Sequence, residues 1–281
     1  MKIGFVGAGR VACSLGKYLA LKGLTITGYY DTCKEAADSA AEFTYSKSFE
    51  QLSDIVCQST LLFLTTPDGI IKDTWEAVKD FVSEHQIICH CSGALPADVF
   101  TGIEQTKAFG CSLHPMLPFN SRYSSYEQLE GSFFTIEGSK EAVEQVSALF
   151  TGLGNTVCQI SGNCKPKYHA AASILSNQVV AVLDTGYHLL EECGFTREDA
   201  VHATEALVQQ NIDHILHEDC IRALTGPIER NDIQTVQKHI DCLNTEDREM
   251  YQILGQKLVH LSEKKHPDFN YKDLLTLLQR I

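Results

Sequence analysis

The sequence has no Cys-x-x-Cys pair, although 11 of its 281 residues are cysteines. The two cysteines closest in sequence, Cys89 and Cys91, are alternate residues of an apolar segment, a spacing that matches neither zinc nor redox motifs. We therefore expect no metal centre and no structural disulfide. Most thiols should be reduced and buried as small hydrophobic side chains.

Long hydrophobic segments and blocks of like charge are also missing. No apolar run approaches the roughly 18 residues that a membrane-spanning helix needs. Residues 1–6 carry neither a long apolar segment nor a cleavage-like site, so we expect no secretory signal and a cytoplasmic protein. The chain has 23 Lys and Arg against 36 Asp and Glu, a formal net charge of −13. Because nucleic acids are bound through Lys and Arg, we expect no nucleic-acid partner.

A glycine-rich loop follows the first apolar run. Residues 3–6 read as a short strand, residues 7–12 are Gly-Ala-Gly-Arg-Val-Ala, and apolar side chains then recur at helical spacing. In this context Gly7 permits a tight turn, Gly9 lets a pyrophosphate approach the backbone, and Ala12 permits close helix packing. The helix N-terminus offers N–H groups to phosphates. The loop predicts a dinucleotide site; an ordinary strand–helix turn is the alternative.

An acidic residue follows the second expected strand. Residues 25–30 end at Asp31, which lies 24 residues after Gly7. A carboxylate at this place suits the ribose hydroxyls of NAD, whereas NADP proteins usually carry Arg or Ser nearby. Lys34 lies close to Asp31 in the sequence, and this cation keeps NADP as an alternative cofactor. The sequence therefore favours NAD without deciding between the two cofactors.

Strands and helices continue to alternate through the first half. Residues 60–64 and 87–91 are apolar strands with a helix around Trp75 between them, and residues 133–136 and 156–160 complete the sheet. Such alternation predicts a doubly wound parallel sheet of the Rossmann type, which binds ligands at the carboxyl ends of its strands. The residues expected at those ends are Thr65, Thr66, Pro67, Ser92 and Gly93.

His114 closes a further strand and precedes a loop with two prolines. Imidazole titrates near neutrality, so His114 is a candidate proton donor or substrate ligand on the same rim of the sheet. A histidine that hydrogen-bonds the loop backbone is an equally good interpretation.

The pattern changes to helices alone after residue 162, which predicts two domains, residues 1–162 and 163–281. Apolar residues from Tyr168 to Leu190 form one stripe over 23 residues, which predicts a single long central helix of an all-α domain. Further helices are expected over residues 195–217, 233–243 and 247–261. His214 and His217, three residues apart beside Glu218, superficially suggest a metal site. No third ligand is identifiable and the spacing matches no zinc motif, so a solvated helix is expected.

A polar stripe runs along the other face of the long helix. Its members, at helical spacing, are Lys165, His169, Ser173, Ser176 and Asn177. Such a stripe on the first helix after a Rossmann domain is able to line a substrate cleft, and a solvated face is the alternative.

These motifs together resemble one family. In the first half they are the glycine loop, His90-Cys91-Ser92-Gly93-Ala94 and His114-Pro115-Met116. In the second half they are residues 168–172 with Ser176-Asn177, and Thr225-Gly226-Pro227-Ile228-Glu229-Arg230 with His239. The chain resembles the Rossmann-like proteins that carry the domain of unknown function DUF2520, described as NADP oxidoreductases and related to pyrroline-5-carboxylate reductase and the β-hydroxyacid dehydrogenases. The resemblance covers almost the whole chain.

The resemblance implies a Rossmann domain, a helical domain and a homodimer formed through the helical domain, but no particular substrate. Two departures matter. Asp31 stands where many members are rich in Arg or Ser. The β-hydroxyacid dehydrogenases place a Lys four residues before an Asn on the long helix, whereas here Ser173 precedes Asn177 by four and Lys165 lies one turn before His169.

The sequence hypothesis is hydride transfer between NAD or NADP and a small carbonyl, hydroxyl or imine compound. His169 or Lys165 is the expected acid or base, Asn177 and Ser92 orient the reacting atom, and His114 is a further candidate. The expected cofactor-binding residues are Gly7, Ala8, Gly9, Arg10, Val11, Asp31, Thr65, Thr66, Pro67, Ser92 and Gly93. A dinucleotide-binding sensor or scaffold without turnover is the alternative, and a fold that has lost its ligand is disfavoured by the intact glycine loop.

Overall fold

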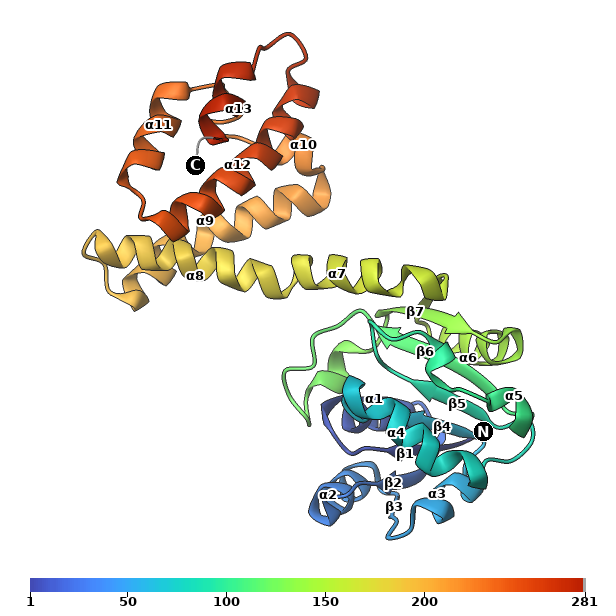
Figure 1. The fold of residues 1–281 in the computed structure, drawn as a ribbon. Coiled ribbons are helices and arrows are strands. Elements are labelled where there is room, and N and C mark those ends of the chain that lie inside the picture. Colours follow the sequence, from blue (N-terminus) through green and yellow to red (C-terminus); the bar gives the residue numbers. More distant parts are fainter. Residues whose placement is uncertain (280–281) are drawn as a thin grey trace. The chain divides into compact units, whose positions relative to one another are not determined.

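The computed structural model describes residues 1–279, which divide into two compact units, Met1–Gln178 and the part from Val179 onward (Figure 1). Each unit is described by itself. We predicted a boundary after residue 162. The last strand ends at Gln159, whereas the compact first unit extends through the following helix to Gln178, because Lys165 of that helix is buried among the ends of the strands.

Within residues 1–279, eight strands form one sheet in the order β3-β2-β1-β4-β5-β6-β7-β8. All neighbouring pairs are parallel except β6 and β7, which run antiparallel. This sheet confirms the predicted Rossmann-like fold. The strands are β1 (Lys2–Val6), β2 (Thr25–Tyr30), β3 (Lys47–Ser48), β4 (Leu61–Leu64), β5 (Ile87–His90), β6 (Phe109–Pro115), β7 (Phe133–Gly138) and β8 (Thr156–Gln159).

Helices connect the strands of the first unit, and short 3₁₀ turns lie at Lys79–Phe81, Ala97–Val99, Ser125–Gln128 and Gly162–Cys164. The helices are α1 (Arg10–Leu21), α2 (Lys34–Thr44), α3 (Leu52–Gln58), α4 (Asp68–Val78), α5 (Ile103–Thr106), α6 (Lys140–Gly152) and α7 (Lys165–Leu175). Because right-handed crossovers bring each parallel strand back in the same direction, the carboxyl ends of β1, β2, β4 and β5 meet at one edge.

Separate apolar cores cover the two faces of the sheet. On one face Phe5 stacks between Tyr29 and Phe63, with ring centroids 5.0 and 5.3 Å apart. On the other face Trp75 and Phe100 pack at 5.4 Å. Alternate residues of a strand point to opposite faces, so the fully apolar strands expected from the sequence contribute side chains to both cores.

The second unit contains helices only, as the sequence predicted for this part of the chain. They are α8, which begins just before the boundary (Asn177–Glu192), α9 (Arg197–His217), α10 (Cys220–Ala223), α11 (Ile233–Cys242), α12 (Thr245–Lys265) and α13 (Lys272–Leu278). Their apolar core joins α11, α12 and α13 through Val236, Ile240, Val259 and Leu274. Asp232 caps α11 by accepting a hydrogen bond from the Thr235 N–H.

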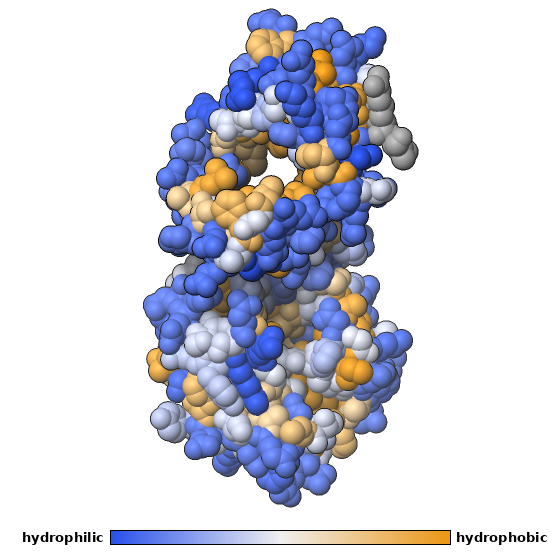
Figure 2. Space-filling model, turned by 90° about the vertical axis from the view of Figure 1, so that its left-hand side faces the viewer, coloured by the Kyte–Doolittle hydropathy of each residue, from blue (hydrophilic) through white to orange (hydrophobic). Residues whose placement is uncertain are grey.

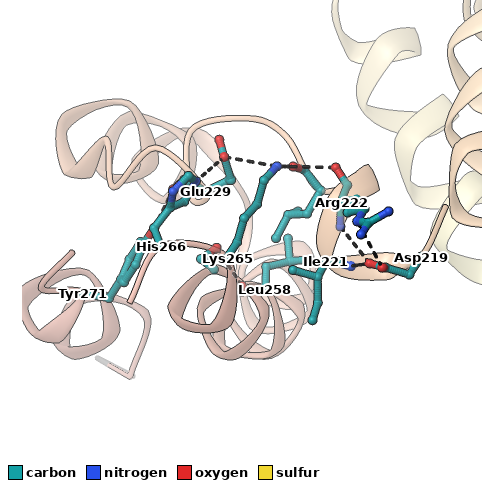
Figure 3. A network of polar contacts seen from close by, with 10 residues as sticks. Asp219, Ile221, Arg222, Glu229, Leu258, Lys265, His266 and Tyr271 are labelled. Carbon is teal, nitrogen blue, oxygen red and sulfur yellow. Dashed lines mark hydrogen bonds and ion pairs between the residues drawn. The ribbon is translucent and has the colours of Figure 1, made fainter. Parts of the chain in front are cut away.

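A polar network ties the loop before α11 to the end of α12 (Figure 3). The Glu229 carboxylate accepts a hydrogen bond from His266 at 2.6 Å and lies 3.3 Å from the Lys265 ammonium. Lys265 also donates to the Leu224 carbonyl, and the Tyr271 hydroxyl donates to the Glu229 carbonyl. The His266 bond lowers the pKa of Glu229. The motif around Glu229 therefore anchors its own loop.

The prediction of one long helix from Tyr168 to Leu190 is wrong. The helix is interrupted at Ser176, whose backbone leaves helical geometry at φ −123° and ψ −73°, and this separates α7 from α8. The Ser176 hydroxyl donates to the Ala172 carbonyl at 2.7 Å, a local bond that competes with the helical backbone ladder. Leu175, Val179 and Val182 of the expected buried stripe are exposed.

The expectation that most thiols are buried is wrong. Cys13, Cys89 and Cys111 are buried in the sheet unit, whereas seven other cysteines are exposed, several of them at helix ends. All eleven are free thiols. Nowhere in residues 1–279 is there a helix with both the length and the apolar character to cross a membrane.

Candidate functional site

The glycine loop makes a tight turn between β1 and α1. Gly7 has φ +96° and donates its N–H to the Tyr30 carbonyl at 2.8 Å. A methyl group on Gly7 would come within 3.0 Å of the backbone of Thr65 and Thr66, so only glycine fits. A methyl group on Gly9 would meet no protein atom within 4 Å. The protein therefore does not require glycine at position 9, and the space there is open to a ligand.

Asp31 closes the loop at the end of β2. Its Oδ2 accepts the Ala8 N–H at 2.7 Å, and its Oδ1 accepts the Cys33 N–H at 2.9 Å. Ala8 is buried, so its contribution to the site is this backbone donor. The carboxylate thus holds the loop in shape and still faces the pocket that the loop forms.

Two threonines at the end of β4 support the same loop. The Thr65 hydroxyl lies 2.9 Å from the Gly7 carbonyl and 3.1 Å from the Val6 carbonyl. The Thr66 hydroxyl bonds that of Thr74 on α4, a helix that begins directly after Pro67. The Thr65 hydroxyl therefore supports the loop directly, whereas that of Thr66 bonds the helix that follows.

The glycine-loop pocket has a volume of about 460 Å³. The walls are formed by Gly7, Gly9, Arg10, Val11, Asp31, Thr65, Thr66, Pro67, Asp68, Cys91, Ser92 and Phe119. Of the expected cofactor-binding residues, only Ala8 and Gly93 do not line it. Sequence reasoning missed Asp68, Cys91 and Phe119, although the strand-end position of Asp68 after Pro67 could have indicated it.

This pocket has the features that a dinucleotide needs. The first turn of α1 carries no acidic side chain and has no side-chain cap, so its N–H groups and positive dipole end remain available to an anion. The open space above Gly9 suits a pyrophosphate, and Asp31 offers acceptors for ribose hydroxyls. The residues present therefore fit a nicotinamide dinucleotide.

Ser92, just after β5, is held from several directions. Its hydroxyl donates to Asp68 Oδ2 at 2.7 Å and accepts the N–H groups of Ala94 and Leu95. Its own N–H donates to His90 Nδ1 at 3.2 Å. One donor and two acceptor sites complete a hydroxyl, so the Ser92 side chain shapes the loop and has no further bond to offer a substrate.

Lys165 lies beneath this loop and lines neither pocket described here. Only 1% of the residue is exposed, and its ammonium donates to the Ser92 carbonyl and to the Ser112 hydroxyl, both at 2.5 Å. Burial lowers the pKa of Lys165, while the charge of Glu137 opposes that effect. The structure therefore places this candidate acid or base below the pocket floor instead of on its wall.

Two neutral histidines surround Lys165. His90 is fully buried, with its Nε2 3.3 Å from the Pro96 carbonyl, and burial together with the Lys165 charge lowers its pKa to about 3. His114 Nδ1 lies 2.6 Å from the Tyr168 hydroxyl. Burial, then Lys165 and His169, lower the pKa of His114 to about 4. Both rings are uncharged at neutral pH.

Gly93 brings two of the candidate residues together. A methyl group placed on it would come 2.6 Å from His169 Cδ2 and 2.8 Å from His114 Nε2. Only a glycine at this position lets both rings approach the backbone so closely. Gly93 thus lines no pocket wall itself but permits the convergence of His114 and His169.

A second pocket, the histidine pocket, has a volume of about 360 Å³. The residues that line it are His114, Met116, Leu117, Pro118, His169, Ala172, Ser173, Leu175, Ser176 and Asn177. It unites three of the expected catalytic residues, His114, His169 and Asn177. Sequence reasoning missed the Tyr168 contact, because Tyr168 falls on the apolar stripe of its helix.

The two pockets are neighbours in the first unit. Ser92 lines the glycine-loop pocket, and the next residue, Gly93, touches both histidines of the other pocket. Phe119 lines the first pocket and the preceding Pro118 lines the second. A ligand in one pocket therefore ends close to a ligand in the other.

Within residues 1–279, no group of three His, Cys, Asp or Glu side chains is placed to hold a metal ion. His217 instead bonds the Asp213 carbonyl of its own helix.

Family models match both halves of the chain. Residues 1–115 match a Rossmann-like domain, and residues 132–258 match the domain of unknown function DUF2520. The chain therefore carries both domains, which confirms the resemblance seen in the sequence.

Solved structures share this fold at low sequence identity. A protein described as a candidate NADP oxidoreductase from Bacteroides fragilis superimposes with a TM-score of 0.74 at 20% identity, over 92% of this chain and 98% of that one. A pyrroline-5-carboxylate reductase from Coxiella burnetii gives 0.61 at 14% identity, covering 99% and 98%. An imine reductase from Myxococcus stipitatus in complex with NADP⁺ gives 0.63 at 15%, covering 94% and 93%. At these identities the likeness is one of fold.

A curated relative matches a shorter stretch. The glucose-6-phosphate 3-dehydrogenase of Bacillus subtilis is 27% identical over 126 residues. The match spans 44% of this chain and 35% of that enzyme, about a third of its length.

The low pKa of His114 predicts an acid-dependent loss of stability. In the unfolded chain the ring takes up a proton near its ordinary pKa of 6.5, whereas the folded ring does so only near 4. The unfolded state therefore binds more protons between these values, so stability should fall as the pH drops from about 6.5 to 4. The ring resonances of His114 in NMR spectra, assigned with His114→Asn, should titrate near pH 4. Titration at or above 6.5 would contradict the proposed environment.

Proposed function

We propose that this chain is a nicotinamide-dependent oxidoreductase that transfers hydride to or from a small carbonyl, hydroxyl or imine compound. The observation that carries the proposal is the meeting of two pockets at Ser92 and Gly93, one shaped for a dinucleotide and one lined by His114 and His169. The names of the fold neighbours, among them an NADP oxidoreductase and an imine reductase, are in keeping with it.

The glycine-loop pocket would hold the cofactor, which supplies or accepts a hydride when bound. The α1 N-terminus would take the phosphates, and Asp31 would accept the ribose hydroxyls. A carboxylate at that place repels the 2′-phosphate of NADP, so we propose NAD as the preferred cofactor. Arg10, on the wall of the same pocket, is the cation available to the phosphates.

We assign the proton transfer to His169. It lines the histidine pocket and is exposed, whereas Lys165 is buried below the floor and the Ser92 hydroxyl is fully bonded. Asn177 and His114 would orient the reacting oxygen or nitrogen. General acid or base catalysis needs a side chain within hydrogen-bond reach of the substrate, which the pocket wall provides.

Gly9→Ala should separate folding from cofactor binding. The added methyl group meets no protein atom within 4 Å, so the melting temperature should stay within about 2 °C. The same group fills the space proposed for the pyrophosphate, so the affinity for NADH in calorimetric titration should fall at least about tenfold. Gly152→Ala, whose methyl group is equally free, is the control. Wild-type binding of neither NADH nor NADPH would refute the proposal.

His169→Ala should abolish most turnover. On a substrate found by screening small carbonyl and imine compounds with the preferred cofactor, kcat/KM should fall by about 10²-fold or more. Lys167→Ala, an exposed neighbour outside both pockets, should leave kcat/KM unchanged. A His169→Ala loss of only a few-fold would rule out this acid–base assignment. Tight cofactor binding without turnover across the panel would favour the sensor or scaffold instead.

We further propose a homodimer formed through the helical unit. Large apolar side chains of α9 are exposed there, among them Leu207 (70%) and Leu216 (74%), and Figure 2 shows apolar residues around a hollow in this unit. Exposed apolar surface of this kind is typical of an interface. Sedimentation of the wild type should give the mass of a dimer. The double variant Leu207→Glu and Leu216→Glu should give a mass closer to that of the monomer. The control Gln210→Glu should give the dimer mass. A monomeric wild type would refute it.

A further inference from the structure

The wall of the histidine pocket carries no carboxylate among the described residues. Its polar members are two imidazoles, two serine hydroxyls and one amide, from His114, His169, Ser173, Ser176 and Asn177. The chain as a whole has 36 acidic residues and a net charge of −13. A protein so rich in Asp and Glu thus keeps them off this wall, and a cationic ligand would find no partner for its charge there.

A buried cation lies behind this wall. Lys165 bonds the Ser112 hydroxyl at 2.5 Å, and Ser112 and His114 are alternate residues of β6, so their side chains leave the same face of the sheet. The charge of Lys165 reaches His114, where together with burial and His169 it disfavours protonation. Glu137 of β7 pairs with Ser112 in the sheet, so its side chain leaves the same face, and its carboxylate accepts the Ala97 N–H at 2.7 Å. The charge of Glu137 counters the effect of burial on Lys165, and the charge of Lys165 still disfavours protonation of His114.

Tyr168 fixes the orientation of the neutral His114 ring. Either group can donate in this bond; in the tautomer we propose, the Tyr168 O–H donates to Nδ1 and the ring carries its proton on Nε2, the nitrogen that faces Gly93. A neutral N–H donor matches the lone pairs of a carbonyl oxygen. An iminium or ammonium group offers hydrogen-bond donors of its own and has no lone pair for Nε2–H.

We propose that the histidine pocket selects an uncharged carbonyl compound, whose oxygen accepts a hydrogen bond from His114, and rejects iminium and ammonium cations. This narrows the substrate classes of the proposed function, on which it rests. Tyr168 and Lys165 act through His114 and are positioning residues.

Two stable five-membered rings of the same size test this preference by ligand-observed NMR on the full chain, with and without NAD⁺. 2-Pyrrolidinone is neutral and presents a carbonyl, whereas pyrrolidinium at neutral pH is a cation. We expect 2-pyrrolidinone to bind at least about tenfold more tightly, the size of effect that one like charge nearby produces. Equal or tighter binding of pyrrolidinium, or no binding of 2-pyrrolidinone, overturns the proposal.

Matched variants locate the effect in this pocket. Ser173→Asp places a carboxylate on the wall and should reverse the preference towards pyrrolidinium, whereas Ser173→Asn should not. Tyr168→Phe removes the bond to His114 and should weaken 2-pyrrolidinone binding without creating a preference for the cation. An unchanged preference in Ser173→Asp would also overturn the proposal. Calorimetric titration of the same samples with NADH reports separately on the proposed function, so the two failures are distinguishable.

Discussion

The hydrogen bonds around Ser92 determine the arrangement of the whole site. Asp68, His90 and Lys165 reach this residue from α4, β5 and α7, and each bonds a different atom of it. A buried ammonium is costly to desolvate, and such a group persists only where several oxygens satisfy it. Of the two oxygens that Lys165 bonds, one is the Ser92 carbonyl in the loop between the two pockets and the other is the Ser112 hydroxyl of β6. The burial of Lys165 and the position of the loop therefore depend on each other.

In the glycine loop, side chains likewise hold the backbone in place. Asp31 and Thr65 form hydrogen bonds with the loop itself. The α1 N-terminus and the open space at Gly9 are left facing the pocket. The Lys165 charge also acts on the second pocket, because it helps keep His114, which is hydrogen-bonded to Tyr168, neutral. The Lys165 ammonium thus influences both the position of the loop at Ser92 and the charge preference proposed for the histidine pocket.

The helices α7 and α8 illustrate where local patterns mislead. Apolar spacing from Tyr168 to Leu190 favours one continuous buried helix. The Ser176 hydroxyl instead donates to the Ala172 carbonyl, the helix breaks at Ser176, and Leu175, just before the break, is exposed. Periodicity reports that a face is apolar but not what covers it. The loop around Glu229, recognised only as a motif in the sequence, turns out to be anchored by His266 and Lys265.

Sequence alone determined the alternation of strands and helices, the glycine loop with Asp31, and the strand-end residues, because these depend on local spacing and on the rule that parallel strands end at one edge. It also selected His114, His169 and Asn177, which share a pocket. Only the tertiary structure decided which candidates face a ligand. Lys165 and His169 lie one turn apart on one helix, yet one is buried beneath a loop from β5 and the other lines a pocket. That difference arises from packing against residues over fifty positions away, which no local pattern encodes.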